Sequence, residues 1–323
     1  MSRPPRISVA IPVYNEAAIV PELLRRLALA LATVPGGPHE VVIVDDGSSD
    51  GTVDLLTAAA ESWPALTVVA LSRNFGHQAA LSAALDHVRG DAVILMDGDL
   101  QDPPEAIPEL VSWYGKGYDV VYVQRRRRKE PWLLRACYFV FYRLMRSMAN
   151  IDLPVDAGDF GLMSRRVVDQ IRTTPERHRY LRGLRRWVGF KQVGVEVERA
   201  ARAGGESKYS LAKLLRLALD GLFAFSTVPL RAATVLGALA VALSTAFAVF
   251  SVIAKLFFDH SPRGFTALIT VVTFMSGVNL CFLGVIGEYV GRIFEQVKGR
   301  PLYVVDRVVR AEARVPSLSH DGR

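Results

Sequence analysis

The sequence predicts an α/β fold, in which a doubly wound mixed sheet is followed by amphipathic helices at a membrane interface and by a two-helix transmembrane hairpin. Three observations lead to this prediction. Short apolar runs alternate with helical patterns over residues 7–124, which is typical of strands joined by covering helices. Arginines then interleave with aromatic and aliphatic residues. The last third holds two long uncharged apolar stretches, each long enough to span a membrane.

Strands and helices are expected to alternate through the first 124 residues. The expected strands are residues 7–13, 41–44, 67–71, 92–96 and 119–123, and the expected helices are residues 16–34, 52–62, 78–88 and 104–114. Ile19, Leu23 and Leu27 recur every four residues, so they share one face of the first helix. Residues 41–44 are wholly apolar, as a buried parallel strand is.

Two amphipathic segments follow this α/β part. In residues 131–149 apolar side chains such as Phe139 alternate with arginines such as Arg143, and in residues 211–226 leucines repeat at helical spacing opposite basic residues. Such patterns predict helices that lie in a membrane interface. An ordinary amphipathic helix that faces a protein core explains them equally well.

The two uncharged stretches predict a transmembrane hairpin. Residues 232–254 and 264–287 lack any charged residue and are long enough to cross about 30 Å of hydrocarbon. The linker between them is too short for anything but a hairpin, so both flanks lie on one side. Arginines and lysines on the flanks outnumber those in the linker, which favours a cytoplasmic location for both flanks.

The predicted organisation follows from these segments. It consists of a cytoplasmic domain over residues 1–210 that includes the interfacial helix 131–149, a juxtamembrane amphipathic helix at 211–226, transmembrane helices at 229–255 and 264–290, and a cytoplasmic tail at 291–323. The expected location is the inner (plasma) membrane, with membrane lipids as partners and both termini in the cytoplasm.

Composition argues against several other classes of protein. The net charge is +7, but no zinc-finger spacing or aromatic RNA-binding motif accompanies the basic runs, so no nucleic acid partner is expected. Cys137 and Cys281 are the two cysteines, too few and too far apart for a disulfide framework or a thiolate metal site. Residues 1–16 meet a charge before an apolar core develops, so we expect no secretory signal peptide.

The strongest chemical signal is a pair of acids directly after an expected strand. Asp97 and Asp99 stand two residues apart, and Gln101 follows them. Two carboxylates on one turn can bind a hard cation, Mg²⁺ or Mn²⁺, that also contacts phosphate oxygens. The alternative is an acidic turn at the start of the helix that begins near Pro103.

Two more polar clusters are expected at the same edge of the sheet. Tyr14 and Glu16 follow the first strand, and Asp46 follows the second. In doubly wound sheets ligands bind beyond the carboxyl ends of the strands. We therefore expect the three clusters to converge at one edge.

Together the three clusters resemble the nucleotide-sugar binding elements of family 2 inverting glycosyltransferases, which have the GT-A fold. The resemblance implies these contacts to a nucleotide-sugar: Pro12, Tyr14, Glu16, Asp46 and Asp97. It also implies that Asp97 and Asp99 hold the metal ion against the diphosphate, with Gln101 as a further ligand.

Within that family the sequence looks most like the polyprenyl-phosphate glycosyltransferases, which include dolichyl-phosphate mannose synthases and bactoprenol glucosyltransferases. The matching elements span nearly the whole chain and are residues 73–78, 97–102, 156–160, 180–184, 187–190 and 202–209. The family commonly has an arginine after the Asp-Phe pair, where this chain has Gly161. Arg165 and Arg166 are candidates to compensate for it.

The acceptor that the resemblance implies is a lipid phosphate, which is ionised near neutral pH and needs little help from a base. Two anions must meet in the site, so cations are required on both sides. Arg125 and Arg126 are the candidates to bind the acceptor phosphate, and the resemblance implies that Arg202 and Lys208 close over the donor. Asp159 is the candidate to orient the acceptor or to act as base.

Non-catalytic roles are the alternatives for these residues. Residues 125–129 form a polybasic stretch that can simply bind anionic lipids, and Asp159 can simply pair with arginines to hold a loop.

Direct displacement inverts the anomeric centre, so an α-linked donor gives a β-linked product. The first choice of substrates is UDP-glucose and undecaprenyl phosphate. Mannose, N-acetylhexosamines and aminoarabinose stay open, because a few side chains discriminate between these sugars.

Three other functions fit parts of the sequence. A processive polysaccharide synthase would carry a Gln-x-x-Arg-Trp element and more spans, whereas residues 183–187 lack the glutamine. A non-catalytic membrane adaptor keeps the fold but is expected to lose at least one metal-binding acid. A dinucleotide-dependent enzyme needs a glycine-rich turn after the first strand, where this chain has residues 14–16. The oligomeric state stays open, a homo-oligomer included.

Overall fold

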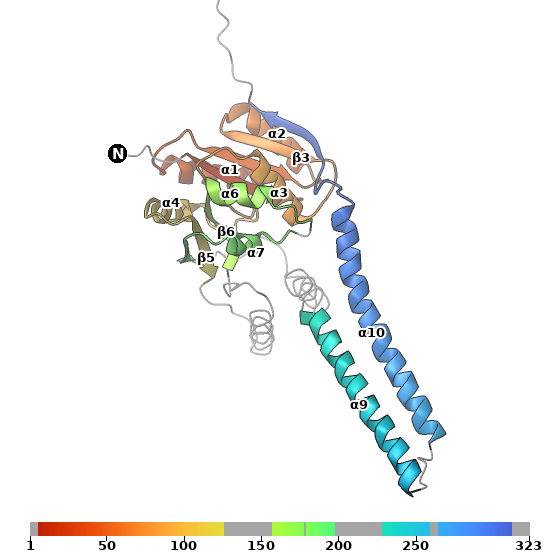
Figure 1. The fold of residues 1–323 in the computed structure, drawn as a ribbon. Coiled ribbons are helices and arrows are strands. Elements are labelled where there is room, and N and C mark those ends of the chain that lie inside the picture. The colour runs from red at the N-terminus through yellow and green to blue at the C-terminus, as the bar shows by residue number, and fades with distance from the viewer. Residues whose placement is uncertain (1–5, 126–156, 178, 198–227, 259–263, 312–323) are drawn as a thin grey trace, which may run out of the picture. The chain divides into compact units, whose positions relative to one another are not determined.

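The structure is a computed structural model that describes residues 6–125, 157–177, 179–197, 228–258 and 264–311 (Figure 1). The chain divides into two compact units. The first comprises residues 1–134, 151–208 and 300–323, and the second comprises residues 135–150 and 209–299. The two units are described separately below.

An eight-stranded mixed sheet forms the centre of the first unit within the described residues, with strand order β7-β5-β6-β4-β1-β2-β3-β8. The strands are β1 Ile7–Val13, β2 Glu40–Asp45, β3 Leu66–Leu71, β4 Ala92–Leu95, β5 Val120–Arg125, β6 Ala157–Ser164, β7 Gln192–Val197 and β8 Val305–Arg310. Strands β4, β1, β2 and β3 run parallel, and β7 is parallel to β5. Strand β6 is antiparallel to β4 and β5, and β8 is antiparallel to β3.

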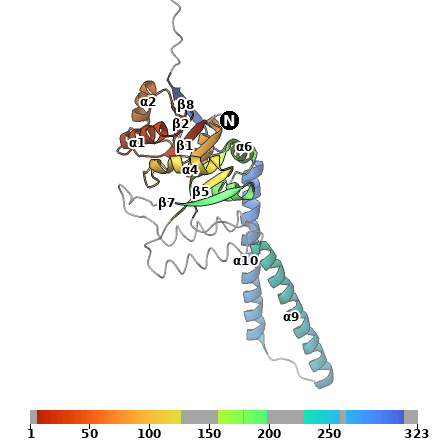
Figure 2. The same ribbon diagram turned by 90° about the vertical axis from the view of Figure 1, so that its left-hand side faces the viewer.

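Helices cover both faces of this sheet. Successive strand residues point to opposite faces, and buried apolar residues pack against helices on each face. Val9 and Ile11 pack with one set of helices, and Ala10 packs with the other. The first set is α1 Val20–Ala32, α2 Thr52–Ser62 and α4 Ile107–Gly115, preceded by the 3-10 turn Pro104–Ala106. The second set is α3 His77–His87, α6 Arg165–Thr173 and α7 Leu181–Trp187. Figure 2 shows α1 and α2 on one side of the sheet and α6 on the other.

The predicted fold class is confirmed, and each of the expected strands and helices of the first 124 residues is present with ends shifted by a few residues. Strands β6, β7 and β8 were not expected. Strand β6 lies between β4 and β5, so the fifth expected strand is not a neighbour of the fourth. Strand β8 shows that part of the segment assigned to a tail, residues 291–323, joins the sheet of the first unit.

The described part of the second unit consists of two long helices, α9 Val228–Phe258 and α10 Phe265–Val297. Each contains an apolar stretch whose described side chains are not buried, Leu230–Phe250 with mean hydropathy 2.1 and Val271–Val297 with mean hydropathy 1.6. By length and composition both can cross a membrane. The predicted interfacial helices at 131–149 and 211–226 lie outside the described residues.

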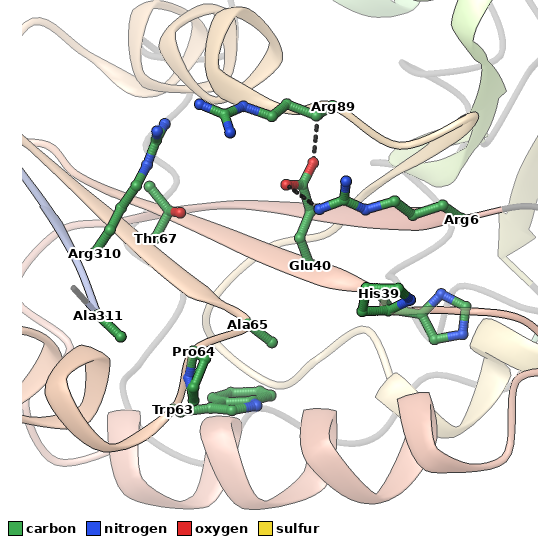
Figure 3. A pocket seen from close by; sticks show the side chains of 11 residues that line it. Arg6, His39, Glu40, Trp63, Pro64, Ala65, Thr67, Arg89, Arg310 and Ala311 are labelled. Atoms are coloured by element: carbon green, nitrogen blue, oxygen red, sulfur yellow. Dashed lines mark hydrogen bonds and ion pairs between the residues drawn. The ribbon is translucent and has the colours of Figure 1, made fainter. Parts of the chain in front are cut away.

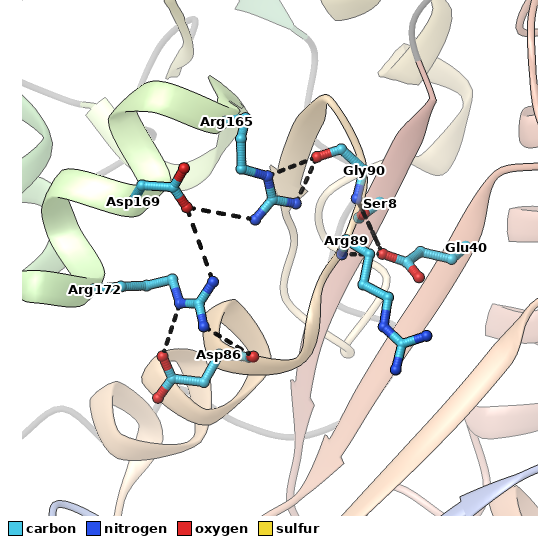
Figure 4. Close-up of polar contacts among 8 residues, drawn as sticks. All are labelled: Ser8, Glu40, Asp86, Arg89, Gly90, Arg165, Asp169 and Arg172. Carbon is cyan, nitrogen blue, oxygen red and sulfur yellow. Dashed lines mark hydrogen bonds and ion pairs between the residues drawn. The ribbon is translucent and has the colours of Figure 1, made fainter.

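A buried carboxylate joins the amino-terminal ends of the strands in the first unit. Glu40 is 7% exposed and accepts hydrogen bonds from Ser8 Oγ at 2.5 Å, from the backbone N–H groups of Arg89 and Gly90, and from Arg6 Nη2 at 3.2 Å. Arg165 then donates to the carbonyl oxygen of Gly90 (Figure 4). The carboxylate therefore links β1, β2 and the turn before β4, and the same turn links to α6.

This arrangement predicts that Glu40→Ala lowers the free energy of unfolding by about 3 kcal/mol, because it leaves several buried donors without an acceptor. For a unit of this size the melting temperature should fall by about 10 °C, as measured by thermal unfolding of the full chain in detergent. The matched control is Glu61→Ala, which removes an exposed acid of α2. Equal melting temperatures for the two variants would contradict the role assigned to Glu40.

Candidate active site

The loops after β1 and β2 are fastened to each other. The backbone N–H of Asn15 donates to Ser48 Oγ at 2.8 Å, and the N–H of Glu16 donates to Thr52 Oγ1 at 3.0 Å. Asn15 has a φ of 54°, a left-handed conformation that asparagine tolerates. Tyr14 is 48% exposed on this loop, so its ring is accessible to a ligand.

Asp46 positions the segment that begins α3. Its carboxylate is 3% exposed and accepts hydrogen bonds from the N–H groups of Phe75 at 2.7 Å and Gly76 at 2.9 Å. Burial raises the pKa of Asp46 above its usual range, against the effect of these two bonds. Gly47 has a φ of 72° and a Cβ there would lie 2.5 Å from the carbonyl carbon of Arg73, so only glycine fits. The predicted nucleotide contact of Asp46 stays a prediction.

The acidic turn after β4 packs against the end of β1. A Cβ on Gly98 would lie 2.6 Å from Val13 Cγ1 and 3.2 Å from the carbonyl oxygen of Pro12, so a side chain there would force the two segments apart. Asp99 Oδ1 accepts a hydrogen bond from the N–H of Gln101 at 3.0 Å. The structure therefore brings the predicted metal-binding turn next to the predicted nucleotide-binding strand end.

Negative charge accumulates around Asp97. Its side chain is 28% exposed. Burial raises the pKa of Asp97 to about 6, and the charges of Asp102 and Asp159 act in the same direction. Neighbouring carboxylates thus disfavour ionisation of Asp97, and a divalent cation bound here would relieve this repulsion.

The donor set fits a divalent cation that is shared with a ligand. Asp97 and Asp99 offer hard carboxylate oxygens of the type that Mg²⁺ and Mn²⁺ prefer. Within the described residues no group of three or more His, Cys, Asp or Glu side chains is arranged to hold a metal ion. A cation at this turn would thus take its remaining ligands from water and a bound substrate, as Mg²⁺ commonly does at phosphate sites.

A second charged group lies beside the acidic turn. Arg182 of α7 binds both carboxylate oxygens of Asp159, Nε to Oδ1 at 2.7 Å and Nη2 to Oδ2 at 2.8 Å. His77 Nε2 at the start of α3 lies 3.5 Å from Asp97 Oδ1 and 3.7 Å from Asp159 Oδ2. His77 therefore bridges the two acids, and the residues come from α3, α7, β6 and the turn after β4.

The charges of this group are mutually stabilised. Burial opposes ionisation of Asp159, but its hydrogen bonds to His77 and Arg182 hold the pKa of Asp159 well below its usual range. Burial likewise opposes the charged form of His77, but the hydrogen bond to Asp159 and the charge of Asp97 raise the pKa of His77. Both carboxylate oxygens of Asp159 are engaged by Arg182, which fits the predicted orienting role of Asp159 better than the predicted base role.

The cation beside Gly161 comes from Arg185 of α7. Arg185 is 4% exposed, and its Nη2 donates to the carbonyl oxygen of Gly158 at 3.0 Å. A Cβ on Gly161 would lie 3.4 Å from Arg185 Nη1. Burial lowers the pKa of Arg185 to about 10, so it stays charged near neutral pH. Arg165 and Arg166, the candidates to compensate, bind the carbonyl oxygen of Gly90 and the carboxylate of Asp119, and their role stays a prediction.

The remaining predicted residues are placed only in part. Arg125 is the last residue of β5. Arg126, Arg202 and Lys208 lie outside the described residues.

A separate cavity of about 580 Å³ is lined by residues that include Arg6, Glu40, Trp63 and Arg310 (Figure 3). It lies at the amino-terminal ends of β1 and β2, away from the acidic turn, and among its described lining residues the one acid is Glu40, whose carboxylate four donors already engage.

Sequence reasoning missed three residues of this site. His77, Arg182 and Arg185 were not named as site residues from the sequence. They stand in segments 73–78 and 180–184 or directly after them, which carried the family resemblance. Their position in or next to these segments was the signal that could have identified them. The sequence does not reveal, however, that α3 and α7 meet at one end of the sheet.

Comparisons with known proteins agree with this architecture. Residues 8–172 match the family model described as Glycosyl transferase family 2. A relative from Bacillus subtilis with the name "Uncharacterized glycosyltransferase YkcC" is 41% identical over 308 residues, 95% of each chain. The SfII prophage-derived bactoprenol glucosyl transferase of Shigella flexneri is 39% identical over 94% of this chain and 98% of its own. The undecaprenyl-phosphate 4-deoxy-4-formamido-L-arabinose transferase of Klebsiella pneumoniae is 36% identical over 94% of both chains.

The close packing at Gly161 yields a prediction about stability. A Cβ at this position would lie 2.5 Å from the carbonyl oxygen of Val121 and 3.1 Å from Tyr122 Cα, so Gly161→Ala should lower the free energy of unfolding by about 1–3 kcal/mol. Gly115→Ala is the control, because its Cβ would meet nothing within 4 Å. Thermal unfolding measures both, and an unchanged melting temperature for Gly161→Ala would contradict the predicted clash.

Proposed function

We propose a reaction for this chain, which belongs to glycosyl transferase family 2. In this reaction the chain transfers a sugar from a nucleotide-sugar to a polyprenyl phosphate, with inversion at the anomeric carbon. The names of the relatives from Shigella flexneri and Klebsiella pneumoniae, which include bactoprenol and undecaprenyl phosphate, support the acceptor class. UDP-glucose is our first choice of donor, and aminoarabinose, mannose and N-acetylhexosamines are the alternatives.

The observation that carries the proposal is the contact between the acidic turn and the end of β1. Gly98 lets the turn approach Pro12 and Val13 closely, so the segments that carry Tyr14 and Asp97 lie next to each other at the carboxyl edge of the sheet. In our proposal Pro12, Tyr14 and Glu16 contact the nucleotide, with Asp46 holding the neighbouring loop in place. The ligand would thus bind where ligands of doubly wound sheets bind.

A divalent cation is part of the proposal. Asp97 and Asp99 would hold Mg²⁺ or Mn²⁺, with Gln101 as a further ligand, and the cation would neutralise the leaving diphosphate. The cationic side chains then act on the acceptor. Arg125 and Arg126 would bind its phosphate, which needs no strong base because it is already ionised.

His77 and Arg182 would add fixed positive charge near the reacting groups. Arg182 is held by both oxygens of Asp159, so its guanidinium is oriented before any ligand binds. Preorganised charges of this kind stabilise a transition state without the cost of reorienting solvent. Asp159 therefore acts in our proposal through Arg182 and His77 rather than as a base. Arg202 and Lys208 would close over the donor.

A non-catalytic membrane adaptor is the second candidate, because fold alone does not establish turnover. The presence of Asp97, Asp99 and the ordered Arg182 pair argues for a working enzyme.

The proposed function is tested by incubating the purified chain with radiolabelled nucleotide-sugars, undecaprenyl phosphate and Mg²⁺ or Mn²⁺, followed by organic extraction. We expect label from one donor to enter the lipid phase and to require the metal ion. If no donor in the panel is transferred by a chain whose melting temperature shows it to be folded, the adaptor is the better reading.

The metal assignment predicts that Asp99→Asn lowers the transfer rate at least about 100-fold, because a charge that acts on the leaving group is lost. Donor binding should also stop depending on Mg²⁺ or Mn²⁺ in this variant, as measured by calorimetry with and without the metal. Asp54→Asn, which changes an exposed acid of α2, serves as the control and should keep full activity. Metal-dependent binding that survives in Asp99→Asn would remove Asp99 from the metal site.

The orienting role of Asp159 predicts strong coupling with Arg182. Asp159→Asn and Arg182→Gln should each lower kcat/KM, and the double variant should be little worse than either, with a coupling energy of about 1–3 kcal/mol. Steady-state transfer rates for the four proteins measure this coupling. Additive losses would instead indicate that Asp159 acts independently, as a base would.

A further inference from the structure

A short turn at the end of α7 exposes two large aromatic side chains. Trp187 is 63% exposed, the highest exposure of any large hydrophobic side chain among the described residues of the first unit, and Phe190 is 40% exposed. Between them Val188 packs against the core below α7. The turn over residues 187–191 is therefore anchored at its centre while its aromatic flanks face outward.

The backbone of this turn is strained at Phe190. Phe190 has a φ of 46° and Gly189 a φ of 80°, and the left-handed region is unfavourable for a bulky aromatic residue. The conformation is held in place, because Gln192 Nε2 donates to the carbonyl oxygens of Arg185 and Gly189. A Cβ on Gly189 would meet nothing within 4 Å, so the turn projects from the surface. Retained strain that exposes an apolar ring points to a functional use of that ring.

Basic residues lie close to this turn in space or in sequence. The guanidinium of Arg166 lies 4.9 Å from the centroid of the Phe190 ring; Arg186 directly precedes the turn in the sequence, and Lys191 is its last residue. Asp119 pairs with Arg166, and Lys191 Nζ lies 4.4 Å from the centroid of the Tyr118 ring. Exposed aromatic rings bordered by arginine and lysine are typical of segments that lie at the interface of a membrane.

We propose that residues 187–191 form a contact between the first unit and the surface of a lipid bilayer. Trp187 and Phe190 enter the interfacial layer, and the neighbouring cations meet anionic headgroups. The same chain carries two apolar helices able to cross a membrane, so a bilayer is the surface at hand. Because α7 also supplies Arg182 and Arg185 to the candidate active site, one helix would link the bilayer surface to the reacting groups.

The contact is tested with the full chain in lipid nanodiscs of phosphatidylcholine and phosphatidylglycerol that carry doxyl-labelled lipid. Cys137 and Cys281 are first replaced by serine, and a fluorescent label is then attached at Phe190→Cys. The matched control carries the label at Leu55→Cys, an exposed apolar position on α2. We expect quenching at position 190 to exceed that at position 55 at least twofold, and any smaller ratio overturns the proposal.

A second measurement avoids any label in the strained turn. Brominated lipids quench tryptophan fluorescence only at close range, so Trp187→Phe should lower the quenched fraction of the total emission. Trp113→Phe, which changes a ring that packs against Tyr118, should not lower it. If Trp187→Phe leaves the quenched fraction unchanged, the turn does not contact lipid. Neither measurement involves sugar transfer, so a failure of the proposed lipid contact is distinguishable from a failure of the proposed function.

Discussion

The candidate site depends on the parallel order of β4, β1 and β2. Neighbouring parallel strands end at the same edge of a sheet, so the segments that follow them meet without any long connection. Gly98 makes the meeting close, because the acidic turn and the end of β1 leave no room for a side chain between them. The hydrogen bonds between the loops after β1 and β2 and the contacts of His77 with Asp97 and Asp159 also lie at this edge.

Fixed opposite charges shape the chemistry of that edge. Asp46 accepts hydrogen bonds from backbone N–H groups, and Asp159 binds Arg182. Asp97 lies 3.5 Å from His77, and burial and neighbouring acids raise the pKa of Asp97 to about 6. A site that concentrates negative charge at one turn and positive charge on the next helix is suited to bringing together two anionic substrates and a cation.

Much of this arrangement can be predicted from the sequence where local patterns decide the structure. The apolar run of β2, the four-residue repeat of α1 and the acid pair Asp97 and Asp99 are strong local signals, and the strands and helices they predict are present. Strand β6 contains two glycines and an aspartate and has no apolar run, so its place between β4 and β5 follows from pairing and not from pattern. The roles of His77 and Arg185 likewise depend on contacts between distant segments, which a single sequence does not encode visibly.

Strand β8 gives the chain an order of assembly. It pairs with β3 at the edge of the sheet and comes after both long helices α9 and α10 in the sequence. During synthesis from the amino terminus, β3 is therefore an open edge until the two apolar helices have been made. Open edges favour pairing with other chains. A cell that makes this protein must keep that edge apart from other nascent chains until the last strand arrives, which ties completion of the sheet to prior synthesis of the apolar hairpin.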